Sequence, residues 1–120
     1  MLAQHATFQR GQQLHNEGDY YEAHEAWEEI WQREEDDDRR LFVQGLIQVT
    51  SAFHKVFFQK QLGGASRLLE RGLQKLERFP DVYEGVLLGP FREGAKACAA
   101  RLAAGKAVEP EHVPQLRCVT

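Results

Sequence analysis

Residues 39–60 form the segment that most limits how this chain can fold. Within it, apolar residues recur at steps of three and four, the period of an α-helix rather than of a strand. A helix of this length would extend roughly 30 Å at about 1.5 Å per residue. We therefore predict a long central helix, because its apolar side chains cover more than half of the circumference, which a surface helix does not need. These apolar residues are Phe42, Val43, Leu46, Ile47, Val49, Phe53, Val56 and Phe57.

Glycine and proline divide the rest of the chain into pieces of helical length with the same period. Gly18 should end the first helix in a left-handed conformation, and Asp19 and Asp38 should cap the next two helices by accepting backbone N–H groups. The expected fold class is all-α, a single domain over residues 1–120 in which about five helices form a compact bundle of antiparallel hairpins around the third. Besides the central helix, we predict helices over residues 3–17, 20–33, 63–79 and 90–104, and an extended tail over residues 106–120.

The composition excludes several classes of protein. The chain has 15 Lys and Arg against 18 Asp and Glu, so it lacks the basic excess of a nucleic-acid-binding domain. Polar residues interrupt the central helix, so we expect no membrane partner and no membrane span. Two cysteines without metal-ligand or redox spacing, and ten first residues unlike a signal peptide, are typical of a cytoplasmic protein.

The predicted second helix carries the sharpest feature of the sequence. His24 and Glu28 are one helical turn apart, so their side chains should meet, and the carboxylate can orient and charge the imidazole. Four aromatic residues lie on the same side, whereas three other glutamates lie on a separate, solvated face. This pattern fits either a hydrogen-bonded boundary between core and solvent or a ligand site. The aromatic residues are Tyr20, Tyr21, Trp27 and Trp31, and the glutamates are Glu22, Glu25 and Glu29.

The central helix carries a polar stripe that needs partners. An unpaired buried polar group costs about 1 to 3 kcal/mol, so neighbours must satisfy these side chains. His24 and Glu28 are the natural partners, and we infer that the second and third helices face each other across a polar pocket. The stripe consists of Gln44, Gln48, Ser51 and Lys55, with His54 at its border with the apolar arc.

A metal site is an alternative use of the same residues. The string His24-Glu25-Ala26-Trp27-Glu28 lacks the second histidine of the zinc-protease pattern HExxH, and Glu25 should face solvent, so that chemistry is excluded. A different divalent site is chemically feasible, in which His24, Glu28 and His54 ligate zinc, iron or manganese and a glutamine or water completes the shell. We predict no other cofactor.

Three motifs stand out when the chain is taken as a whole: His24-x-x-x-Glu28-x-x-Trp31, then Gln44-Gly45-Leu46-Ile47-Gln48 with the downstream His54, and then Gly64-Ala65. Over residues 8–79 the chain resembles the domain-of-unknown-function family 309. The resemblance implies a small helical bundle in which these residues line a pocket or active site of unassigned chemistry. Members of that family often carry a Gly-Asn pair shortly before the Gly-Ala, whereas residues 59–63 differ here, so the resemblance does not extend to that loop.

A second resemblance suggests another kind of function. Residues 18–23 and Gly64-Ala65, followed by Gly72 and Pro80, are similar to the turn and second helix of a tetratricopeptide hairpin. The spacing of 42 residues from Ala23 to Ala65 differs from the repeat length of about 34, so we expect no regular array.

Two functional hypotheses follow. In the first, the chain binds a small polar ligand; if it is an enzyme, His24 acts as acid or base while Glu28 holds its tautomer. In the second, the same residues are structural and the chain is a tetratricopeptide-like interaction module. The wide apolar arc also leaves a homodimer open. Ser51 is the only hydroxyl on the stripe, which disfavours a covalent intermediate. Besides the pair, the ligand would contact Tyr20, Trp27, Trp31, Gln44, Gln48 and His54.

Overall fold

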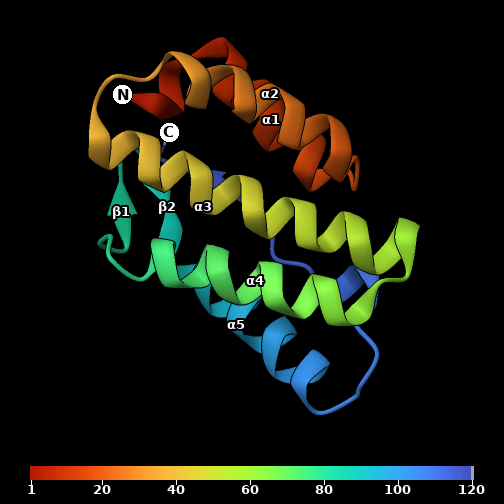
Figure 1. Ribbon diagram of the computed structural model, residues 1–120. Helices are drawn as coiled ribbons and strands as arrows, with labels where there is room; N and C mark the ends of the chain where they lie inside the picture. The colour runs from red at the N-terminus through yellow and green to blue at the C-terminus, as the bar shows by residue number, and fades with distance from the viewer. Residues whose placement is uncertain (120) are drawn as a thin grey trace.

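The computed structural model describes residues 1–119 and confirms an all-α fold. Five α-helices pack as a bundle, with a small three-stranded sheet at one end (Figure 1). The helices are α1 (Ala6–Asn16), α2 (Tyr20–Arg33), α3 (Asp37–His54), α4 (Leu62–Leu76) and α5 (Leu88–Ala103). Shorter elements are the 3-10 turns η1 (Leu2–Gln4) and η3 (Pro110–His112), the π-helix η2 (Lys55–Gln59), and the strands β1 (Val82–Tyr83), β2 (Val86–Leu87) and β3 (Arg117–Cys118).

Helix α3 is the central helix that the apolar pattern predicts. The α1–α2 hairpin packs on one side of it, and α4 covers the other side with α5 beneath (Figure 1). Phe42, Leu46 and Phe53 are fully buried along its length. The stretch from α3 through η2 is long and apolar enough to cross a membrane by length and composition alone. Most of its apolar side chains instead belong to the core of the bundle, while Phe58 is exposed.

Two glycines let α3 and α4 approach closely. A Cβ atom on Gly72 would lie 2.9 Å from the carbonyl oxygen of Gly45 and 2.8 Å from Cγ2 of Val49. A Cβ atom on Gly45 would lie 2.8 Å from Cδ2 of Leu76. Because real Cβ contacts are longer, only glycine fits both positions without displacing a neighbour.

The helix termini agree in part with the predictions. Gly18 ends the first hairpin turn at φ 87°, in the predicted left-handed region. Asp19 stands at the N-cap position of α2, but its carboxylate makes no capping hydrogen bond. The prediction for Asp38 is wrong, because α3 begins at Asp37, two residues before the predicted start. The capping residue is Asp36, whose Oδ1 accepts the backbone N–H of Arg39 at 2.9 Å.

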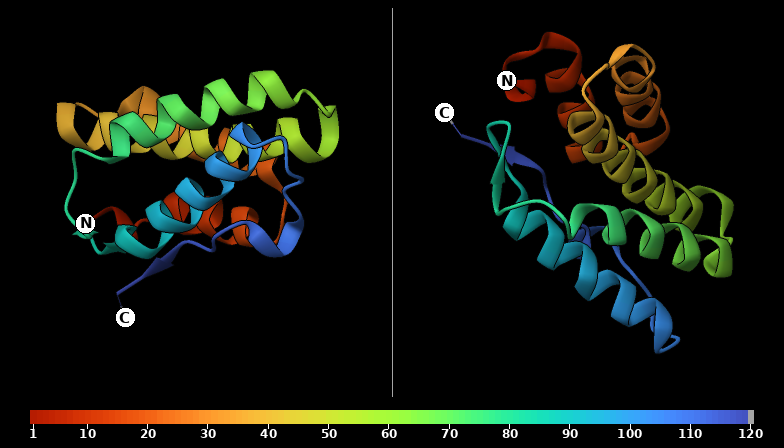
Figure 2. Two further views of the ribbon diagram at one scale, coloured as in Figure 1. Left: turned by 90° about the horizontal axis from the view of Figure 1, so that it is seen from below. Right: turned by 60° about the vertical axis from the view of Figure 1, so that its left-hand side comes forward.

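The tail is more ordered than an extended segment. After α5 it forms η3 and then returns along α1, where β3 pairs with β2 through Val86 opposite Cys118 (Figure 2). Leu116 is fully buried, and its backbone N–H and C=O are both bonded by the side-chain amide of Asn16. The C-terminal tail is therefore bonded to α1, near the N-terminus of the chain. Thr120, the last residue of the predicted tail, lies outside the described residues.

Candidate functional site

His24 and Glu28 form the hydrogen-bonded pair that their spacing predicts. Nε2 of His24 lies 2.7 Å from Oε2 of Glu28, and the two side chains are 28% and 39% exposed. An ionised carboxylate only accepts hydrogen bonds, so Nε2–H of the imidazole is the donor. Glu28 thereby fixes the orientation of the ring and leaves Nδ1 of His24 for another partner.

Four rings follow one another across the junction of α2 with α3. From Tyr21, ring centroids lie 5.7 Å from His24 and 5.5 Å from His54. His54 in turn stacks on Phe58 at 5.3 Å with an interplanar angle of 22°. We call Phe58, His54, Tyr21 and His24 the aromatic row. The row links α2 to the C-terminal end of α3 and to η2.

A cavity of about 170 Å³ lies against this row. Its other polar side chains come from the end of α3 and from the π-helix that follows. Nζ of Lys55 donates to Oε1 of Gln59 at 3.4 Å and to Oε1 of Gln61 at 3.3 Å. π-Helical turns are rare and recur at functional sites, and here the wider turn carries two of the lining residues. We call this cavity the α2–α3 pocket; it is lined by Tyr21, His24, Ser51, His54, Lys55 and Gln59.

Two buried polar atoms near the pocket have no hydrogen-bond partner within residues 1–119. They are Nδ1 of His54 and Oε1 of Gln48. His54 lines the pocket directly, whereas Gln48 lies about two turns earlier on α3. Each such atom costs about 1 to 3 kcal/mol unless it is satisfied. The polar stripe is therefore incompletely paired.

The structure corrects the predicted partners of the two glutamines. His24 and Glu28 bond to each other, and no described residue bonds to Oε1 of Gln48. Gln44 and Gln48 are half-buried and do not line the α2–α3 pocket. Of the predicted stripe, Ser51 and Lys55 line this pocket together with His54, and Gln59 joins them from η2.

Three of the predicted aromatic contacts belong to packing. Trp27 is fully buried and donates its Nε1–H to the carbonyl of Phe8 at 3.2 Å. Tyr20 is buried against Phe57, and burial, with a smaller contribution from Cys98, raises the pKa of its phenol to about 12. Trp31 lies half-buried beneath the guanidinium of Arg40, 4.0 Å from the ring centroid. Tyr21, placed on the same stripe, is the aromatic residue of α2 that lines the pocket.

His15 is a buried polar residue that the sequence analysis did not single out. Its Nδ1 lies 2.9 Å from the hydroxyl of Thr50, and its Nε2 lies 3.0 Å from the carbonyl of Pro114. Because a carbonyl only accepts, Nε2 carries the proton and Thr50 donates to Nδ1. Burial lowers the pKa of His15 to about 4, against the opposing effect of the Pro114 bond. His15 lies four residues beyond Gly11 and seven beyond Phe8 along the buried stripe of α1, which is the signal that could have identified it.

The described geometry bears on the metal hypothesis as well. Among residues 1–119, no three His, Cys, Asp or Glu side chains cluster closely enough to hold a metal ion. Glu28 is instead engaged with Nε2 of His24. A divalent metal on His24, Glu28 and His54 stays a prediction of the sequence.

The fold defines the class of protein, a small all-α bundle. The chain belongs to the family described as "Domain of unknown function (DUF309)", which matches residues 8–68, and the predicted family is confirmed. Over 77 residues it is 31% identical to an uncharacterized protein of Aquifex aeolicus (strain VF5). That alignment covers 64% of this chain and 23% of the relative, so the chain spans less than a quarter of the relative's length.

Proposed function

We propose that this chain binds a small polar ligand in the α2–α3 pocket, with His24 and His54 as the contacting imidazoles. The observation that carries the proposal is the buried, unpartnered Nδ1 of His54 on a ring that lines the pocket. A ligand atom that bonds this nitrogen would remove a cost of about 1 to 3 kcal/mol. Ser51 and Lys55 supply a hydroxyl and an ammonium group beside it.

The same arrangement supports proton transfer to or from a bound ligand. Glu28 holds Nε2 of His24, so Nδ1 is the atom that accepts or returns a proton. The six lining residues carry two hydroxyl groups, the phenol of Tyr21 and the side chain of Ser51. Among the described residues, no group within hydrogen-bond reach activates the hydroxyl of Ser51. Acid–base chemistry or plain binding therefore fits this pocket better than a covalent intermediate.

Ligand titration monitored by NMR tests the proposal. The probes are sodium acetate, acetamide, inorganic phosphate, phenyl phosphate and zinc chloride, each followed through the ring signals of His24 and His54. We expect at least one probe to shift both signals saturably, and His54→Phe to remove that response. His5→Phe is the matched control, since His5 is exposed at the start of α1. If none of the probes shifts either histidine, the proposal is wrong.

A stability measurement separates a ligand site from a structural network. His24 and Glu28 are about one third exposed, so breaking their pair should cost less than about 1 kcal/mol. We expect His24→Ala and Glu28→Ala to change the free energy of unfolding by no more than that. A loss above about 2 kcal/mol would identify a structural network and favour the tetratricopeptide-like interaction module. A cytoplasmic location and a homodimer stay predictions of the sequence.

A further inference from the structure

We infer that the ligand of the α2–α3 pocket combines a flat aromatic ring with an anionic group. The ring would stack on Phe58 at the end of the aromatic row, and the anion would meet the ammonium of Lys55. This inference rests on the proposed function and adds the chemical class of the ligand. Three observations support it independently: the exposure of the Phe58 ring, the neutral hydrogen-bond partners of the Lys55 ammonium and the volume of the cavity.

Phe58 is exposed in a way that the other phenylalanines are not. It is 65% exposed, whereas Phe8, Phe42, Phe53 and Phe91 are fully buried. One face of its ring is stacked on His54, which lines the pocket, while Phe58 itself is not one of the lining residues. A single exposed apolar side chain is common in proteins. Phe58, however, continues a row of rings that already lines a cavity, which is the arrangement of a stacking platform.

Helical spacing accounts for the position of this ring. Side chains four residues apart lie next to each other on one face of a helix, so Phe58 lies over His54 and Gln59 lies beside Lys55. The left-handed residue Lys60, at φ 52°, then ends the turn. The stacking face and the cation of the pocket are thus built by one short element.

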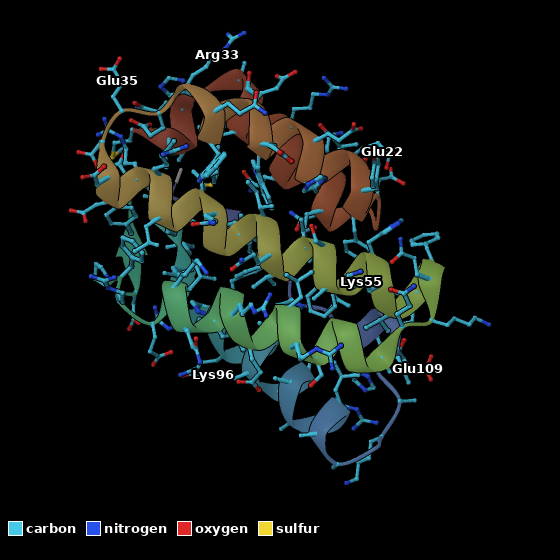
Figure 3. All side chains as sticks on the ribbon, in the orientation of Figure 1. Glu22, Arg33, Glu35, Lys55, Lys96 and Glu109 are labelled. Atoms are coloured by element: carbon cyan, nitrogen blue, oxygen red, sulfur yellow. The ribbon has the colours of Figure 1, made fainter. Side chains whose placement is uncertain are left out.

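Lys55 supplies a positive charge that no carboxylate neutralises within residues 1–119. Its ammonium is held by two neutral amide oxygens, those of Gln59 and Gln61, rather than by an acid. Residues 55–71, which run from the pocket into α4, contain four Lys and Arg against one Glu, which favours an anion at this end. Residues 17–38 contain eleven acids and one Arg, and Figure 3 shows Glu22 and Glu35 along the edge formed by α2 and the loop after it. The anion must therefore sit toward Lys55, away from α2.

The size of the cavity limits the ligand. At about 170 Å³ it is close to the roughly 150 Å³ that holds one benzene molecule in an engineered protein cavity. One six-membered ring or one phosphate group fits inside, and the remainder of the ligand must lie over the exposed row. Aryl phosphates and nucleoside monophosphates share this chemistry, so the experiment includes both.

The test compares the affinities of matched probes for the intact chain. We expect phenyl phosphate or AMP to bind at least tenfold more tightly than inorganic phosphate or benzyl alcohol, since one base–aromatic stack contributes about 1 to 3 kcal/mol. A preference for AMP would identify a nucleotide, and a preference for phenyl phosphate would identify an aryl ligand. Both preferences support the inference.

Two variants assign the two halves of the ligand. Phe58→Ala should weaken phenyl phosphate about tenfold and leave inorganic phosphate unchanged, whereas Lys55→Met should weaken both. Leu62→Ala is the matched control, because Leu62 is an exposed apolar residue (54%) just after η2. Phe58→Leu repeats the test should the alanine variant be unstable.

The contradicting outcomes are separable. Equal affinities for inorganic and phenyl phosphate, or an unchanged affinity in Phe58→Ala, would overturn the aromatic half and leave the proposed function standing. Tighter binding of tetramethylammonium than of phosphate would overturn the anionic half, since acidic α2 would then dominate. No saturable shift with any probe would overturn both this inference and the proposed function.

Discussion

At the scale of single residues, His15 and His24 show how differently one side chain is used. His15 is 1% exposed, and its ring lies 5.4 Å from both Tyr20 and Phe91. Both of its nitrogens bond to protein atoms, so it is neutral and structural. His24 is partly exposed and has one nitrogen engaged by Glu28. Proton exchange with a ligand is therefore open to His24 alone of the two.

The burial of His15 predicts a specific loss of stability in mild acid. Its pKa is about 4 in the folded state against 6.5 for the unperturbed group, so the unfolded chain binds more protons between these values. The contribution of His15 to the free energy of unfolding should therefore be at its full value above pH 6.5. It should fall by about 3 kcal/mol as the pH approaches 4. Urea unfolding of the native chain across this range measures the loss.

His15→Gln is the comparison that isolates the effect. Glutamine can still donate to the carbonyl of Pro114 but does not titrate, so its pH dependence between 6.5 and 4 should be shallower than that of the native chain. Carboxylates titrate in both chains and cancel in the difference. Parallel curves for the two proteins would show that His15 does not become charged on unfolding.

At the scale of elements, the sequence predicted the features that depend on the spacing of residues along a single helix. The apolar arc of α3 and the bounds of α2 follow from spacing along one helix, and so does the contact of His24 with Glu28. The π-helix could not be predicted, because Val56, Phe57 and Phe58 suit an α-helix equally well. Two of its residues, Lys55 and Gln59, line the α2–α3 pocket with the predicted His24 and His54, whereas the predicted Gln44 and Gln48 do not.

Because α3 and α4 approach closely, replacing two glycines of α4 by alanine should change the free energy of unfolding in opposite directions. Gly72→Ala should lower the free energy of unfolding by about 1 to 3 kcal/mol, because the new Cβ meets the backbone oxygen of Gly45, which cannot swing aside. Gly63→Ala, in the first turn of the same helix, should raise it by up to about 1 kcal/mol. At Gly63 the nearest atom is 3.6 Å away, on the flexible side chain of Arg67.

Chemical denaturation of the two alanine variants and the native chain measures both changes. The same substitution in one helix controls for helix propensity, so the difference between the sites reports packing against α3. Equal effects at Gly72 and Gly63 would mean that the two helices can separate without loss.

At the scale of the whole molecule, the sequence could not reveal the contacts between segments that are far apart in the chain. β2 and β3 are two residues each, too short to show an alternating pattern, and they pair across more than thirty residues of chain. The amide of Asn16 reaches Leu116, one hundred residues away. Nothing local to Asn16 distinguishes this role from that of an ordinary helix-terminal residue.

Asn16→Ala tests how much this long-range contact stabilises the fold. The substitution leaves the backbone N–H of the buried Leu116 without its partner, and we expect the free energy of unfolding to fall by about 2 kcal/mol. Gln13→Ala on the same helix is the control, because Gln13 is exposed and bonds only to Glu17. Equal stability of the two variants would show that the tail contributes little to holding α1.

The tail also bears on what a shorter relative would need. The family match ends at residue 68, within α4, yet His15 and the core around it are covered by Phe91 and Leu116 from beyond that point. A protein that carries only the matched segment would leave this apolar surface open to water. It must therefore shield this surface with other sequence of its own or with another molecule.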